Sequence, residues 1–384
     1  MGLGFIYESD LLKHYVRYSA WLPACKRRLK IIKAGVPVEK SRRLRYFTFC
    51  AVGAIDVLML DVAKIIRQSN SGRFDTVVYF DRTPELVIET SKRIPGAIGF
   101  PGDFVNVILA DDPDEVTVLD SDEMLSALED QLDNAETRKK QILLGQRHSF
   151  IGKFPFDVIN LDLEEYLFKP NDPLPGRLVN ALRKIFLWQQ RSFTAGNRRA
   201  PQYLDGFSLM FTTRIGPHEL GSGYLEMLKS YLRDNLKNNE EFIPLLENRS
   251  GGITDIDSLH ATNFELFFKI AVPKVLANIL IETDWYIDPD FGVTIIEFER
   301  SPEGVPPYKM LHLVMDIKRQ NPTRVNRPPG VGIDDRVKSA YSYVVSKIIG
   351  DAEINIDETN IDVTELQNNL DSIISRRKKY CPDD

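Results

Sequence analysis

Metal-binding and nucleophile motifs are missing from this sequence of 384 residues. Its three cysteines are widely separated and form no CxxC pair, and its five histidines show neither HxH nor HxxxH spacing. These absences argue against a zinc site, so we expect no metal. The sequence also contains no GxSxG, no Walker A GxxxxGK[ST] and no HExxH motif. The common serine hydrolases, P-loop NTPases and zinc proteases are therefore disfavoured.

Long apolar runs are missing as well. No stretch of about 18 apolar residues occurs, which is the length that a membrane-spanning helix needs. Glu8, Asp10, Lys13 and Arg17 interrupt the first residues, so these lack the apolar core of a signal peptide. Together with the few cysteines, this pattern predicts a cytoplasmic protein that does not contact a membrane.

The composition itself is that of a globular protein, with 43% hydrophobic and 27% charged residues. A net charge of −6 excludes a uniformly basic nucleic-acid binder. The charge is unevenly distributed, however. Residues 13–45 contain eleven Lys or Arg and one acid, whereas residues 103–136 contain twelve acids and no Lys or Arg. Two oppositely charged segments of this kind suggest that each has a partner of complementary charge.

From residue 46, apolar runs of strand length alternate with helical patterns. We expect strands at residues 46–52, 76–80, 97–100, 156–161, 207–213, 293–298 and 310–317. The expected helices cover residues 56–68, 83–93, 121–140, 177–191, 218–238 (as a pair), 264–281, 333–349 and 363–380. Alternation of this kind predicts parallel strands, and the short connection before residue 310 predicts a terminal antiparallel hairpin.

These elements predict an α/β fold with a Rossmann-like, seven-stranded, mostly parallel sheet and helices on both faces. We expect a basic helical N-terminal arm at residues 1–45 and a helical C-terminal tail at 321–384. The Rossmann-like domain occupies residues 46–320, with an acidic insertion at about 104–150. In such open sheets, ligands bind at the carboxyl ends of the strands. The residues that follow the first four strands include several acids: Asp56, Asp81, Asp103 and Asp162.

The order of elements and the acids at the strand ends resemble class I S-adenosylmethionine-dependent methyltransferases, over about residues 46–317. The resemblance implies that the first turn approaches the methionine part of S-adenosylmethionine and that the second strand end holds the ribose. It implies also that the third strand end lines the adenine. The residues that match these cofactor-binding positions are Ala51, Gly53, Asp56, Asp81, Arg82, Gly102, Asp103 and Phe104. Asn160 and Asp162 match the catalytic stretch that faces the methyl acceptor, since FDVINLD looks like the FDVIDLDPFG-type stretch of some RNA methyltransferases.

The sequence departs from the family pattern in two places. Ala51 and Ala54 stand where glycines are expected, and the fourth-strand motif lacks its proline and its glycine. Alternative interpretations therefore stay open: Asp81 could cap a helix, Asp103 could be a turn residue, and Asp162 could begin a solvated acidic helix. The leading hypothesis is a methyltransferase acting on nucleic acid. The alternatives are a catalytically inactive, methyltransferase-like binding or assembly subunit with a protein partner, and a nucleotide-binding enzyme of another chemistry.

The basic N-terminal segment has two interpretations as well. Tyr15, Tyr18 and Trp21 lie among its Lys and Arg residues, a mixture that suits stacking on single-stranded bases together with phosphate contact. In the other interpretation, an amphipathic helix packs these aromatics on the core or docks on the acidic insertion. The first interpretation makes this segment the expected nucleic-acid interface.

Overall fold

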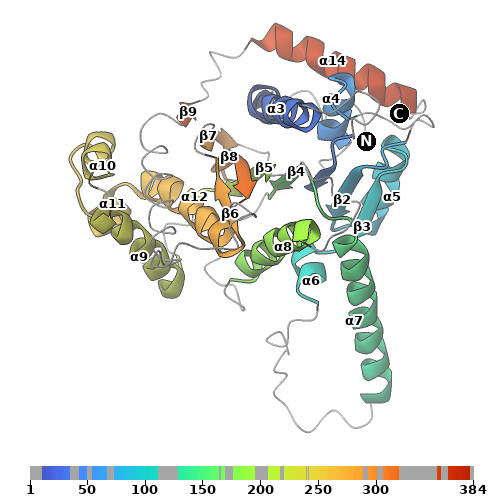
Figure 1. The fold of residues 1–384 in the computed structure, drawn as a ribbon, viewed down its shortest axis with the longest axis horizontal. Coiled ribbons are helices and arrows are strands. Elements are labelled where there is room, and N and C mark those ends of the chain that lie inside the picture. Colours follow the sequence, from blue (N-terminus) through green and yellow to red (C-terminus); the bar gives the residue numbers. More distant parts are fainter. Residues whose placement is uncertain are drawn as a thin grey trace.

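A mostly parallel β-sheet runs through the computed structural model, with helices on both of its faces (Figure 1). This confirms the predicted α/β class. The structure describes residues 11–34, 43–49, 54–66, 73–110, 129–163, 166–168, 176–194, 206–216, 220–238, 240, 242–288, 293–300, 306–319, 353–355 and 362–380. The helix expected at residues 333–349 lies outside these residues.

The sheet has the strand order β3-β2-β1-β4-β5-β8-β7-β9, and β6 pairs with β8. Its strands are β1 (Tyr46–Phe49), β2 (Val77–Asp81), β3 (Ile98–Pro101), β4 (Val158–Asp162), β5 (Gly206–Arg214), β6 (Trp285–Ile287), β7 (Val293–Arg300), β8 (Tyr308–Arg319) and β9 (Glu353–Asn355). The pairings among β1 to β5 are parallel, β8 is antiparallel to β5, β6 and β7, and β9 is parallel to β7.

All seven predicted strands are present, and β7 with β8 forms the predicted antiparallel pair. The predicted number of strands was too low, because the described residues form nine. The two additional strands, β6 and β9, are each three residues long and pair with β8 and β7 respectively. A three-residue segment is too short to show the alternation of side chains by which strands are recognised in a sequence.

One face of the sheet is covered by α6 (Phe104–Ile108), α7 (Glu129–Ile151), α8 (Arg177–Thr194) and α12 (Phe264–Glu282). Beyond α12 lie α9 (Ser222–Asn238), α10 (Phe242–Ser250) and α11 (Ile256–Thr262). Helix α12 is apolar around nearly its whole circumference, which fits its position between the sheet and these outer helices. The predicted helix pair at residues 218–238 is a single helix, α9, in the described residues. Helix α7 ends at Ile151, about three turns beyond the end of the helix expected at 121–140.

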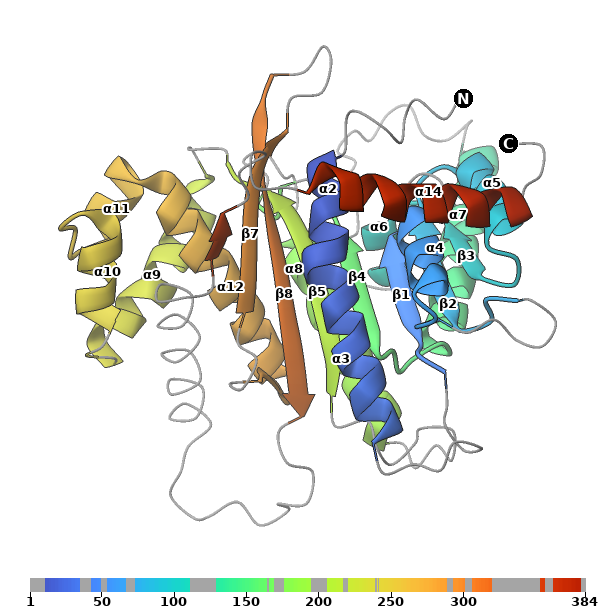
Figure 2. The ribbon, with the colours of Figure 1, turned by 90° about the horizontal axis from the view of Figure 1, so that it is seen from above.

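The other face carries α2 (Leu11–Val16), η1 (Arg17–Trp21) and α3 (Leu22–Lys33), which form one continuous helical segment with a π-helical centre. Beside it lie α4 (Ile55–Val62), α5 (Pro84–Arg93) and α14 (Val363–Tyr380) (Figure 2). Successive residues of β4 serve the two faces in turn: Val158 packs with the α3 and α4 cluster, and Ile159 packs with the α8 and α12 cluster.

The N-terminal helical segment is part of the core. The side chain of Trp21 is 1% exposed, and Val16, Ala20 and Cys25 are buried in the same cluster as strand residues of β4, β5 and β8. Trp21 is therefore not available to stack on a base, whereas Tyr15 and Tyr18 are half-buried. The packing agrees with the second of the two interpretations of this segment, that of an amphipathic helix.

The C-terminal helix α14 packs on α4 and α5 (Figure 2). Arg376 forms an ion pair with Asp61 of α4, and the hydroxyl of Tyr380 donates to the same carboxylate at 3.1 Å. Among the described residues, no helix combines the length and the apolar character needed to span a bilayer.

Candidate functional site

The carboxyl ends of β1 to β5 lie at one edge of the sheet, because these strands are parallel. In the sheet register Asp81 pairs with Pro101, and Asp162 pairs with Thr212. The amide of Gly102 donates to the carbonyl oxygen of Asp81 at 2.8 Å. The loops after β2 and β3 are therefore held together, and the end of β4 lies one strand further, beyond β1.

Asp81, Arg82 and Asp103 surround the ends of β2 and β3. One carboxylate oxygen of Asp81 accepts from the amide of Thr83 at 2.9 Å, and partial burial raises the pKa of this carboxyl group. Asp103 caps α6 by accepting from the amide of Asn106 at 3.0 Å. Arg82 lies 3.6 Å from Asp103, and both side chains are accessible to solvent. The structure thus brings these three predicted residues together. Asp103 caps a helix, whereas Asp81 bonds the amide of Thr83, which is itself the N-cap residue of α5.

Phe104 points away from this edge. Its ring is 7% exposed, and its centroid lies 4.6 Å from that of Phe49 and 5.3 Å from that of Phe80. The ring belongs to an aromatic cluster beneath α6. The strand-end pattern could not show this, because Phe104 begins a helix that turns its side chain inwards.

The turn after β1 is described only from Ala54, so Ala51 and Gly53 lie outside the described residues. Ala54 has φ 55° and ψ 33°, a left-handed conformation that glycine adopts at lower cost. Asp56 is 1% exposed, and its Oδ2 accepts from the hydroxyls of Tyr46 at 2.9 Å and Thr48 at 2.7 Å. Burial raises the pKa of Asp56, although both hydroxyls and Arg17 act in the opposite direction. Asp56 therefore lies inside the protein, in the first turn of α4.

Asn160 and Asp162, the two predicted catalytic residues, lie two positions apart on β4 and share the face covered by the N-terminal helices. The amide of Asn160 donates to the hydroxyl of Tyr46 at 2.9 Å, so Tyr46 joins Asn160 to Asp56. Oδ2 of Asp162 lies 2.8 Å from Nζ of Lys13, and the two side chains are 4% and 7% exposed. Burial alone would raise the pKa of Asp162, but Lys13, His312 and Arg17 outweigh it and lower the pKa.

Sequence reasoning did not find this polar interior beneath α2 and η1. Lys13 and Arg17 are four residues apart, so they extend from the same side of the helical segment. Arg17 is 2% exposed, and its guanidinium lies 5.8 Å from the ring centroid of Trp21. Several buried polar atoms here have no hydrogen-bond partner among the described residues: Arg17 Nε, Trp21 Nε1, Asp56 Oδ1, Asn160 Oδ1 and Asp162 Oδ1. The sequence feature that could have indicated it is the spacing of Lys13, Arg17 and Trp21 at intervals of four residues, which places two cations and an indole on one side of a helix.

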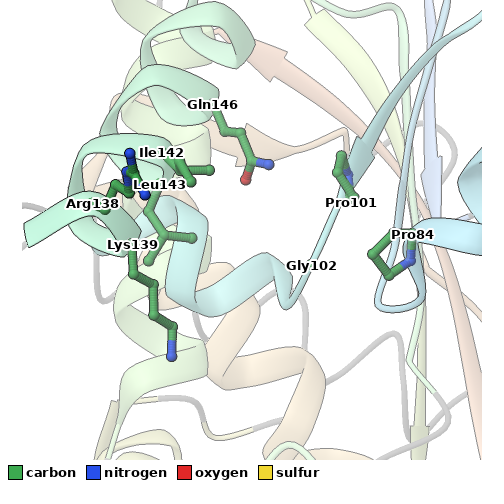
Figure 3. A pocket seen from close by; sticks show the side chains of 8 residues that line it. All are labelled: Pro84, Pro101, Gly102, Arg138, Lys139, Ile142, Leu143 and Gln146. Atoms are coloured by element: carbon green, nitrogen blue, oxygen red, sulfur yellow. The ribbon is translucent and has the colours of Figure 1, made fainter. Parts of the chain in front are cut away.

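A cavity of about 450 Å³ opens beside the loops that carry Asp81 and Asp103 (Figure 3). Its walls come from the start of α5, the end of β3 and one side of α7. The lining residues are Pro84, Pro101, Gly102, Arg138, Lys139, Ile142, Leu143 and Gln146. Gly102 is the one predicted site residue in this wall.

In the described part of the chain, no three His, Cys, Asp or Glu side chains gather closely enough to hold a metal ion. Neither protein-family models nor curated proteins nor solved structures gave a match to this chain.

Proposed function

We propose that the protein is a methyltransferase of the class I, S-adenosylmethionine-dependent type, acting on nucleic acid. The observation that carries the proposal is the order of the sheet. The parallel strands lie in the order β3-β2-β1-β4-β5, which supports a Rossmann-like, doubly wound sheet. In such a sheet, ligands bind where the strand order reverses, which would be between β1 and β4. The antiparallel β8 beside β5 matches the antiparallel strand on which the resemblance rests.

The end of β2 suits a nucleoside. Asp81 presents a carboxylate at the edge of the sheet, next to the backbone of Gly102, and a carboxylate can accept two charge-assisted hydrogen bonds from the hydroxyls of a ribose. Gly102 has φ 112° and open space where a Cβ would stand, so a ligand can approach its backbone closely. Asp81 and Gly102 would thus hold the nucleoside end of the cofactor.

The end of β4 suits the acceptor. Asn160 and Asp162 each have a buried side-chain oxygen without a hydrogen-bond partner among the described residues, and both oxygens lie on the same face of the strand. Two such oxygens would accept the N–H or O–H of an acceptor group and orient it. The cofactor supplies an electrophilic methyl group when it is bound. The contribution of the protein is then mainly to position the acceptor in line with that group.

Titration calorimetry with S-adenosylmethionine and S-adenosylhomocysteine tests the proposal. We expect micromolar binding by the wild type and a loss of at least about tenfold in Asp81→Ala, since each lost charge-assisted bond is worth roughly 1.5–3 kcal/mol. Asp75→Ala is the matched control, because Asp75 lies just before the amino end of β2 and is exposed. Absence of binding by folded wild-type protein, or equal loss in both variants, would overturn the proposal.

A second function is favoured by the ion pair between Lys13 and Asp162. This pair covers the end of β4 with α2, which closes the place where an acceptor would enter. A protein of this kind would bind the cofactor without transferring its methyl group, and would serve as a binding or assembly subunit. Transfer of radioactive methyl groups to total RNA or DNA distinguishes the two: incorporation supports the methyltransferase, and cofactor binding without incorporation supports the subunit.

A further inference from the structure

One side of α7 lines the cavity beside β3, and the side chains on that side change in chemical character along the helix. Arg138, Ile142 and Gln146 follow each other at intervals of four residues, and Lys139 and Leu143 form a second row with the same interval. Residues four apart in a helix lie on the same side of it. This side of α7 therefore presents two cations at one end, two aliphatic side chains in the middle and an amide at the other end.

The opposite wall is apolar and close to the backbone. Pro84 and Pro101 face the helix across the cavity, and the side chain of Gln146 extends toward Pro101 (Figure 3). Gly102 adds a stretch of backbone without a side chain. Ile142 is 58% exposed, so its side chain is accessible to a ligand in the cavity.

We propose that this cavity binds a nucleoside phosphate. Its volume lies within the range of small-molecule sites, and it combines apolar walls with a few polar groups. The base would lie between the two prolines and the aliphatic side chains of α7, where the amide of Gln146 can both donate to and accept from the edge of the base. The phosphate would bind Arg138 and Lys139, whose side chains are exposed at the opening.

The charge of the site separates this ligand from the proposed cofactor. S-Adenosylmethionine has a net positive charge at neutral pH and no phosphate, so Arg138 and Lys139 would favour a nucleoside phosphate over it. This site rests on the proposed function, in which a nucleic acid is the methyl acceptor. A nucleotide of that acceptor would bind next to the loops after β2 and β3, which would hold the cofactor. A free nucleotide has the same chemistry, so the source of the phosphate is left to the experiment.

Calorimetry on the full chain with the four ribonucleoside monophosphates, and with the four corresponding nucleosides, tests the cavity. At least one monophosphate should bind, and removal of its phosphate should weaken binding by about tenfold or more. Arg138→Ala/Lys139→Ala should lose binding to a similar extent. Lys140→Ala is the matched control, because this neighbouring exposed cation does not line the cavity and should bind as the wild type does.

A second variant and a second titrant make the result decisive. Ile142→Glu places a negative charge in the cavity at an exposed position, and it should also abolish binding of the monophosphate. Fluorescence anisotropy with labelled RNA and DNA pentanucleotides identifies the source: tighter binding than the monophosphate indicates a nucleic acid, and weaker binding a free nucleotide. No binding of any of these probes, or equal binding by the double variant and Lys140→Ala, would overturn the inference. S-Adenosylmethionine binding by the same samples would leave the proposed function standing in that case.

Discussion

Nζ of Lys13 and Oδ2 of Asp162 are 2.8 Å apart, and only 7% and 4% of the two side chains are exposed. The pair joins the first described helix, α2, to the carboxyl end of a central strand, β4. Burying two charges costs several kcal/mol for each ion, and their attraction offsets this cost only while both partners are present. The pair therefore makes the N-terminal helices dependent on the residue that sequence patterns suggest for the acceptor site.

Removal of one partner should be more costly than removal of both. We expect Lys13→Met to lower the free energy of unfolding by about 3–5 kcal/mol, since it leaves the Asp162 carboxylate buried without its cation. Lys13→Met/Asp162→Leu should recover most of this loss. Urea denaturation of the wild type, both single variants and the double variant measures the coupling. Additive effects of the two single substitutions would show that the pair does not act as a unit.

The same pair should make the free energy of unfolding depend on pH in the acid range. The pKa of Asp162 is lower in the folded protein than in the unfolded chain, where it is about 3.9. Its contribution to stability is therefore complete above about pH 5, one unit above the pKa of the unfolded chain, and disappears as the pH falls through the lower pKa of the folded state. Other carboxylates titrate in this range, so the quantity to measure is a difference. The stability advantage of the wild type over Lys13→Met should shrink between pH 5 and pH 3. A constant advantage across these pH values would contradict the assignment.

Local patterns along the chain were sufficient to predict the strands that build the sheet. Runs such as residues 156–161 are apolar and short, end at an acid and are followed by helical spacing, and each became a strand of the parallel half. The edge strands β6 and β9 were missed because hydrogen bonding to longer neighbours, β8 and β7, determines their conformation. That information is non-local and is not contained in three residues.

The candidate site was predictable only in part, for the same reason. Asp81, Arg82 and Asp103 lie together because the ends of neighbouring parallel strands must. Asp162 also follows its strand, but its environment is determined by Lys13, which is distant in sequence. Counting charges over residues 13–45 could not show which cations are buried, because the group that pairs with a buried cation can come from a distant element, as Asp162 of β4 does for Lys13.

The left-handed conformation of Ala54 leads to a prediction about the first turn. For a residue with a Cβ this conformation costs roughly 1–2 kcal/mol relative to the right-handed one, and glycine avoids most of the cost. Ala54 is fully buried, so its substitution by glycine also removes a packed methyl group. We expect Ala54→Gly to change the free energy of unfolding by less than about 1 kcal/mol, because the two effects oppose each other.

Binding of the proposed cofactor, S-adenosylmethionine, should reveal more about Ala54 than measurements of stability do. If the turn after β1 must adjust around a ligand, glycine at this position should permit the adjustment, and Ala54→Gly should bind S-adenosylmethionine more tightly than the wild type. Calorimetry under the same conditions for both proteins gives the comparison. Weaker binding by the variant would show that the left-handed turn is already the binding conformation and that the methyl group supports it.

Lys274 lies inside α12 and donates from its ammonium to Oδ1 of Asn235 on α9. The side chain is 1% exposed, and burial lowers its pKa to about 7, although nearby Asp234 acts in the opposite direction. In the unfolded chain the pKa of lysine is about 10.4. Between these two values the unfolded chain binds one more proton than the folded protein. Stability therefore rises with pH by about 1.4 kcal/mol per pH unit from this group.

Lys274→Met should remove that dependence. The variant should gain stability relative to the wild type at pH 6 to 7, where the wild type has to bury a charged ammonium or release its proton. This relative gain should decrease by about 1.4 kcal/mol for each pH unit between pH 7.5 and 9. Denaturation curves over this range test the expectation, with Lys237→Met as the control, since Lys237 is an exposed lysine of α9. A stability difference between Lys274→Met and the wild type that does not change with pH would mean that Lys274 titrates alike in the folded and unfolded chains. Its hydrogen bond to Asn235 would then be strong enough to keep the buried ammonium charged.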